Sequence, residues 1–143
     1  MITFNEYVEA MKEDQKEIYF ASGESVEKID HLPTVEMVKD KGFDILYLTD
    51  NVDEFCLQML RDYKEKAFKN INQGDLDIES DEEKKELEKV NESNKDLLET
   101  LKEALKDQVQ DVKVSSRLKS HPVCLVSGEG VSFEMEKVFK SNA

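Results

Sequence analysis

The chain has 143 residues, enough for one modest hydrophobic core and some additional segments. Its formal net charge of −13 argues against nucleic acid or an anionic membrane as the main partner, because both require a basic surface. The mean hydropathy is −0.63, no signal peptide opens the sequence, and no apolar run approaches the roughly 20 residues that span a bilayer.

The N-terminal stretch predicts a helix followed by a buried strand. Thr3 and Glu6 match the capping-box pattern, so a helix should begin there and run to about Met11. The segment EIYFA, residues 17 to 21, is typical of a short buried strand. A helical stretch follows, and Pro33 suits the first turn of a new helix within it.

Gly42 should end that helix and lead into a second strand, residues 43 to 48. A helix is expected at about residues 52 to 61, and a third, edge-like strand at residues 66 to 71. This alternation predicts a small parallel sheet with right-handed crossovers. The fold class is therefore α/β, with a βαβαβ subdomain over residues 1 to 72.

The composition then becomes acidic and polar. Ser80 and Glu83 repeat the capping-box spacing, and one long helix should run from there to about Lys106. Its apolar stripe breaks at Asn94 and is too short for a confident coiled coil. We interpret residues 73 to 107 as an acidic linker and a connecting helix that packs on both neighbours.

The last part predicts two strands, residues 109 to 118 and 123 to 127, followed by an amphipathic helix that contains Met135 and Phe139. A sheet that has only begun suggests a truncated domain. We expect residues 108 to 143 to be the start of an α+β domain, and the whole sequence to be a segment of a longer protein.

Three acids lie where the second strand gives way to its helix, and they pose the question of a metal site. Asp50, Asp53 and Glu54 all fall within five residues. A metal site would need carboxylates that converge from different elements. At a helix start, Asp50 can cap free N–H groups, and Asp53 and Glu54 meet the positive end of the helix dipole. We therefore favour helix capping.

Other motifs give weak signals for chemistry. Residues 75 to 86 resemble a calcium loop, but Ser80 stands at the sixth position, where the sharp turn requires glycine. His121 and Cys124 supply only two metal ligands. The glycines form neither GxGxxG nor a P-loop. We expect no catalytic, metal-binding or cofactor-binding residue in this sequence.

The sequence also suggests how exposed the two cysteines and three large apolar residues are. Cys56 and Cys124 are far apart in apolar settings, which is typical of buried thiols in a reducing cytoplasm and not of a disulfide. Phe55 forms either the edge of the core, which we favour, or a contact surface. Met135 and Phe139 should be exposed unless partner segments cover them. If both are exposed, we expect them to cause self-association.

The order of these segments resembles the heat shock protein 90 chaperone family. Three stretches carry the resemblance: NEYVEAMKEDQKEIYFASGES, GFDILYLTDNVDEFCLQML and VKVSSRLKSHPVCLVSGEGVSFEMEKVFKSNA. The similarity is collinear over nearly the whole chain and weakest in the acidic linker. Asn51 replaces the family's usual proline, and Val131 stands where many members have tryptophan, which favours a bacterial member.

The resemblance implies a place within a larger protein. Residues 1 to 72 would be the small α/β subdomain of the middle domain, and residues 108 to 143 the truncated start of the C-terminal domain. The parent would be a cytoplasmic homodimer driven by ATP and magnesium. Its nucleotide-binding domain, its catalytic arginine loop and its main dimer helices would lie elsewhere, so we expect no enzyme activity and no cofactor in this segment.

The resemblance also implies contact with partly folded client proteins. Carried over residue by residue, it proposes Glu54, Phe55, Gln58 and Met135 as client-binding residues. Acidic residues around exposed apolar ones suit basic and apolar surface on such clients. The alternative is a purely structural spacer that transmits ATP-driven rearrangement without touching a client.

Overall fold

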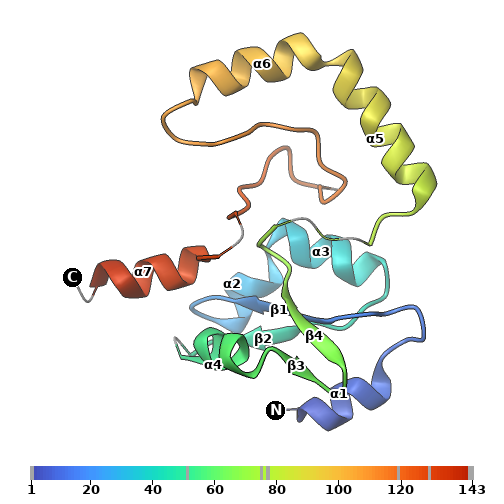
Figure 1. Ribbon diagram of the computed structural model, residues 1–143, viewed down its shortest axis with the longest axis vertical. Helices are drawn as coiled ribbons and strands as arrows, with labels where there is room; N and C mark the ends of the chain where they lie inside the picture. Colours follow the sequence, from blue (N-terminus) through green and yellow to red (C-terminus); the bar gives the residue numbers. More distant parts are fainter. Residues whose placement is uncertain are drawn as a thin grey trace. The chain divides into compact units, whose positions relative to one another are not determined.

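The computed structural model describes residues 2–50, 52–74, 76, 78–118, 120–128 and 130–141 (Figure 1). The chain forms two compact units, Met1–Asp75 with Leu118–Ala143, and Leu76–Arg117. The division of the sequence into domains at residues 72 and 107 stays a prediction.

The first unit is built on a four-stranded sheet in the order β2-β1-β4-β3. The strands are β1 (Ile18–Ser22), β2 (Leu46–Leu48), β3 (Asp62–Tyr63) and β4 (Lys66–Asn70). Phe20 of the central strand β1 lies between Leu46 of β2 and Asn70 of β4, and both pairings are parallel. The expected βαβαβ arrangement is therefore present in β1, β2 and β4.

The prediction of a purely parallel sheet is wrong at one edge. The short strand β3, which the sequence pattern did not reveal, pairs antiparallel with β4. Lys64 and Glu65 make the turn between them with φ angles of 50° and 63°. Hairpin turns of this kind usually contain asparagine or glycine, so the sequence lacks the usual hairpin signal.

Five helices belong to the same unit: α1 (Phe4–Ala10), α2 (Val26–Asp30), α3 (Pro33–Asp40), α4 (Asp53–Leu60) and α7 (Phe133–Ser141). The capping box at the start of α1 is confirmed, because Thr3 Oγ1 accepts from the Glu6 N–H and the Glu6 carboxylate accepts from the Thr3 N–H. Gly42 follows α3 with a φ of 78°, as expected of a glycine that ends a helix. Among the described residues, no helix combines the length and apolar character that crossing a membrane requires.

The core lies on both faces of the sheet. On one face, residues from α1 and α4 pack with the strands in one cluster: Tyr7, Ile18, Phe20, Leu46 and Leu57. Tyr19 and Ala21 point to the opposite face of β1 and are also buried. Right-handed crossovers in opposite directions along the sheet place α2 and α3 on the face opposite α4.

The second unit contains α5 (Asp81–Ser93) and α6 (Lys95–Ala104). The prediction of one continuous helix is wrong, because the helix stops at Asn94, whose side-chain amide donates to the Val90 carbonyl at 2.8 Å. The capping box at Ser80 and Glu83 is confirmed. Neither helix has a buried residue. The packing of this segment on both neighbours stays a prediction.

The two strands expected near the C-terminus are also absent. Residues 109–118 and 123–127 are all described and contain no strand, only one isolated bridge between Gln73 and Ser127. An alternating pattern in two short segments is marginal without further strands to pair with. The amphipathic pattern after them is confirmed as α7.

Candidate functional site

The start of α4 differs in detail from the predicted cap. Val52 occupies the N-cap position, and no side chain caps the helix. The Asp53 carboxylate instead accepts from the backbone N–H of Asp50 at 3.4 Å. The prediction that the Asp50 side chain caps this helix is therefore wrong. Asp53 does lie in the first turn, where its charge meets the helix dipole. Asn51 is outside the described residues.

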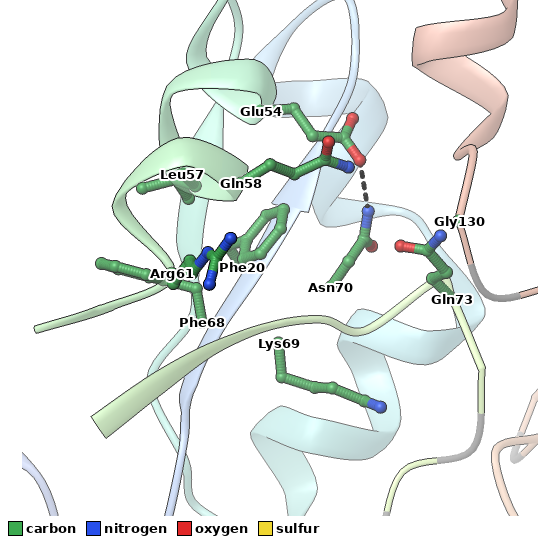
Figure 2. Close-up of a pocket in the computed structure, with 10 residues that line it drawn as sticks. All are labelled: Phe20, Glu54, Leu57, Gln58, Arg61, Phe68, Lys69, Asn70, Gln73 and Gly130. Carbon is green, nitrogen blue, oxygen red and sulfur yellow. Dashed lines mark hydrogen bonds between the residues drawn. The ribbon is translucent and has the colours of Figure 1, made fainter. Parts of the chain in front are cut away.

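Glu54 points into the protein. Its side chain is only 3% exposed, although it is an ionisable residue in the first turn of a helix. One carboxylate oxygen accepts from the Ser22 hydroxyl at 2.9 Å. The other accepts from the Asn70 amide at 3.0 Å (Figure 2). Glu54 therefore ties α4 to the ends of β1 and β4.

A pocket of about 480 Å³ opens beside this contact, between α4 and β4. Glu54, Gln58, Arg61, Asn70 and Gln73 supply its polar wall, and Phe20, Leu57 and Phe68 supply apolar surface. Figure 2 shows the Phe20 ring between the α4 side chains and β4. Because both Glu54 oxygens already accept hydrogen bonds, this acid acts as a structural acceptor in the pocket wall.

Helix α7 packs against α4. The Gln58 amide donates to the sulfur of Met135 at 3.1 Å, and the rings of Phe55 and Phe139 meet edge to face with centroids 5.9 Å apart. At the N-terminus of α7, the buried Ser132 hydroxyl accepts from the Met135 N–H at 3.2 Å. Two side chains of α4 thus contact two side chains of α7.

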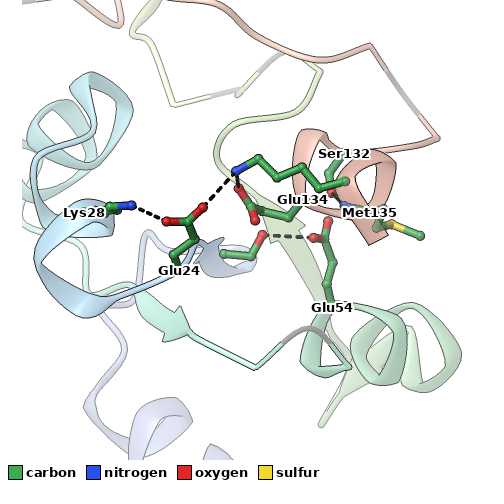
Figure 3. A network of polar contacts seen from close by, with 8 residues as sticks. Glu24, Lys28, Glu54, Ser132, Glu134 and Met135 are labelled. Atoms are coloured by element: carbon green, nitrogen blue, oxygen red, sulfur yellow. Dashed lines mark hydrogen bonds and ion pairs between the residues drawn. The ribbon is translucent and has the colours of Figure 1, made fainter. Parts of the chain in front are cut away.

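Charged side chains add a second connection to α7 (Figure 3). Lys137 lies 2.8 Å from Glu134 in the same helix and 3.7 Å from Glu24, which precedes α2. The hydrogen bond to Glu134 raises the pKa of Lys137, and the hydrogen bond from Lys28 lowers the pKa of Glu24. Lys137 and Glu24 are exposed and Glu134 is half-buried, so these ion pairs contribute little to stability.

The structure brings the four predicted client-binding residues together but exposes them unequally. Gln58 is exposed, Phe55 is half-buried, and Glu54 is buried. Met135 is 5% exposed, so the expectation that it is open to solvent is wrong, because α4 covers it. Phe139 is 52% exposed, which agrees with the expectation for that residue. Their role in client binding stays a prediction.

Met59 was not among the contact residues proposed from the sequence, although it is the most exposed apolar side chain of α4. Met59 is 85% exposed and lies one helical turn after Phe55, on the same side of the helix. The spacing of four residues from Phe55 could have revealed it. Exposed or half-buried side chains from the two helices therefore form one surface, which we call the α4–α7 surface and define by Phe55, Gln58, Met59 and Phe139.

The weak metal motifs find no support among the described residues, which contain no group of three or more histidine, cysteine, aspartate or glutamate side chains able to hold a metal ion. His121 Nδ1 lies 3.6 Å from the Glu36 carboxylate. Asp75 and Asp77 of the calcium-like loop lie outside the described residues.

Comparison with known proteins identifies the family of this chain. The family model described as Hsp90 protein matches residues 1–143, and the chain belongs to this family. It is similar to the chaperone protein HtpG of Clostridium acetobutylicum, with 57% identity over 140 residues, and to that of Bacillus subtilis, with 48% identity over 141 residues.

The HtpG protein of Clostridium perfringens is 55% identical over 141 residues. These alignments cover 98% or 99% of this chain but only 22% of each relative. The chain thus spans about a fifth of the length of the curated relatives that it matches. The resemblance to the Hsp90 family and to its bacterial members is confirmed.

Proposed function

We propose that this chain is a segment of an ATP-dependent molecular chaperone, and that its α4–α7 surface contacts partly folded client proteins. The names of the relatives support the chaperone class. At the level of the longer protein, we propose ATP and magnesium as cofactors, a homodimer as the assembly, and the cytoplasm as the location. The nucleotide-binding and main dimer-forming parts would lie outside this segment.

The observation that carries the proposal is the exposure of large apolar side chains from two helices at one place. Met59 and Phe139 are 85% and 52% exposed, and both are neighbours of Phe55. Apolar groups gathered in this way on a soluble protein are typical of an interaction surface.

Electrostatics suggests the kind of client segment that fits. Asp53 and Glu54 begin α4, Glu134 and Glu136 begin α7, and the whole chain has a net charge of −13. This acidic background attracts lysine and arginine and repels acidic chains. We propose that the preferred client segments combine apolar side chains with basic ones.

The second function that we consider is a coupling element between the middle and C-terminal domains. The contacts of α7 with α4 favour it, because they join residues far apart in the sequence, Gln58 to Met135 and Phe55 to Phe139. A coupling element could also contact clients. Without such contact, it would be a purely structural spacer.

Titration of a partly folded client separates these two functions. Fluorescence anisotropy would measure client affinity for the 143-residue chain and for the Phe55→Ala and Met59→Ala variants. We expect each variant to bind about three- to tenfold more weakly, because each loses apolar contact area. Leu97→Ala is the matched control, since Leu97 is 58% exposed on α6, which belongs to the other compact unit. Unchanged affinity in well-folded variants would favour the spacer.

A further inference from the structure

We propose that Glu54 is a positioning residue and not a direct client contact. It would fix α4 on the ends of two strands and connect α4, through a short series of hydrogen bonds, to Ser127 in the segment that leads to α7. The inference rests on the proposed client-binding function of the α4–α7 surface, and it assigns a different role to one of the residues that the family resemblance placed there.

The burial of Glu54 is the first observation. With 3% of its side chain exposed, it has almost no surface to offer a client in this structure. Its two carboxylate oxygens accept from neutral donors, the Ser22 hydroxyl and the Asn70 amide. Burying a carboxylate beside neutral donors is unfavourable compared with an apolar side chain of similar size. Stability alone therefore does not explain a glutamate here, whereas precise orientation of α4 does.

The series of hydrogen bonds continues beyond Asn70. Its side-chain oxygen accepts from the Asn72 N–H at 2.9 Å. The Asn72 carbonyl then accepts from the Ser127 N–H at 3.2 Å and from the Ser127 hydroxyl at 3.3 Å. Asn70 and Ser127 are 5% and 8% exposed, so these bonds are largely shielded from water. Glu54 is thus connected to a residue 73 positions later in the sequence through two asparagines.

The direction of these bonds makes the series sensitive to the Glu54 carboxylate. Asn70 must donate with its nitrogen to Glu54 and accept with its oxygen from Asn72. If residue 54 presents a donor instead, Asn70 can satisfy one neighbour only by turning its amide and losing the other. An unsatisfied polar group in a buried site is strongly unfavourable, so the change should reach Ser127.

An exchange of side chains tests this role. The single variants are Glu54→Gln, whose oxygen can still accept from Asn70 while its nitrogen donates to the Ser22 hydroxyl, and Asn70→Asp, which places two carboxylates together. In the double variant E54Q/N70D, the Gln side chain can donate to the Asp carboxylate, which still accepts from the Asn72 N–H. The bond between positions 54 and 70 is then restored with donor and acceptor reversed, while position 54 has lost its charge.

Two measurements on the full 143-residue chain decide the inference: amide hydrogen exchange at Ser127 by NMR, and the affinity of a partly folded client by fluorescence anisotropy. We expect Asn70→Asp to exchange about tenfold faster at Ser127 and to bind the client several-fold more weakly, and Glu54→Gln to stay within about twofold of the unmodified chain in both. The double variant should return to within about twofold of the unmodified chain in both. Circular dichroism would select folded variants.

The direct-contact role predicts a different pattern. Glu54→Gln and E54Q/N70D would then both bind the client several-fold more weakly, because the charge is missing in both, whereas Asn70→Asp would leave client affinity unchanged. Either result, or unchanged Ser127 exchange in a folded Asn70→Asp variant, would overturn the positioning role. If the unmodified chain binds no client, the proposed function fails, while the exchange measurement still decides whether Glu54 controls Ser127.

Discussion

The ring of Phe55 in α4 meets the ring of Phe139 in α7 edge to face, with the two centroids 5.9 Å apart. The contact joins residues 84 positions apart in the sequence. Phe139 remains 52% exposed, so the pair also presents an aromatic surface to the outside. The same two rings therefore hold α7 in place and form part of the surface that we propose for clients.

This aromatic pair should contribute a measurable coupling energy. The test is a double-mutant cycle with Phe55→Leu and Phe139→Leu. We expect an interaction energy of about 0.5 to 1 kcal/mol, which is the lower part of the range for aromatic pairs, because the Phe139 ring is half exposed. Urea unfolding of the four proteins measures this interaction energy. Strictly additive effects would show that the ring contact does not stabilise the position of α7.

The hairpin between β3 and β4 should accept a stabilising substitution. Glu65 has a φ of 63°, a conformation that glycine adopts without strain. We expect Glu65→Gly to raise the free energy of unfolding by about 1 kcal/mol, as measured by urea denaturation. Glu65→Ala is the control, because it removes the same side chain and keeps the strain. Equal effects of the two substitutions would refute the explanation.

The capping box of α1 should make stability depend on pH. Hydrogen bonds from the Thr3 backbone N–H and hydroxyl lower the pKa of Glu6 below its ordinary value of 4.5. A lowered folded-state pKa means that the stabilisation is complete above the ordinary value and is lost as the pH falls through the folded-state pKa. Glu6→Gln keeps the hydrogen-bonding shape without titrating.

We therefore expect the stability difference between the unmodified chain and Glu6→Gln to be largest at neutral pH and to shrink as the pH falls below about 4. Urea denaturation across this range measures the difference. A difference that stays constant with pH would show that the charge of Glu6 does not strengthen the cap.

Oxidation should distinguish two methionines near the same surface. Met59 is 85% exposed, whereas Met135 is 5% exposed and its sulfur accepts a hydrogen bond from Gln58. With dilute hydrogen peroxide, we expect Met59 to form sulfoxide at least about tenfold faster than Met135, because access to the sulfur controls the reaction. Peptide mass spectrometry measures both sites. Comparable rates would indicate that α7 leaves α4 readily.

Local signals explain which elements could be predicted. The capping box of α1 and the proline at the start of α3 act through nearby atoms, and both elements form where expected. The helix break at Asn94 was not predicted from such a signal. The apolar stripe is interrupted at this residue, but the pattern as a whole still predicts one helix. The hairpin turn at Lys64 and Glu65 uses residues that rarely adopt positive φ, so the sequence pattern could not indicate β3.

The candidate site depends on contacts that no local pattern contains. An acid at the start of a helix ordinarily faces water, and only the positions of Ser22 and Asn70 explain why Glu54 is buried. Likewise, Met135 is buried and its sulfur accepts a hydrogen bond from Gln58, 77 residues earlier. The residue types could be proposed from the sequence, whereas their exposure required the fold.

Cys56, adjacent in sequence to Phe55, is an exposed free cysteine in α4, so the expectation that it is buried is wrong. Cys124 is half-buried, and the sequence contains no other cysteine. A thiol-reactive fluorophore can therefore be attached within α4, beside the proposed client surface, without adding a residue, once Cys124 is replaced by serine. The native sequence thus provides an attachment point for an optical sensor that reports directly on occupancy of the α4–α7 surface.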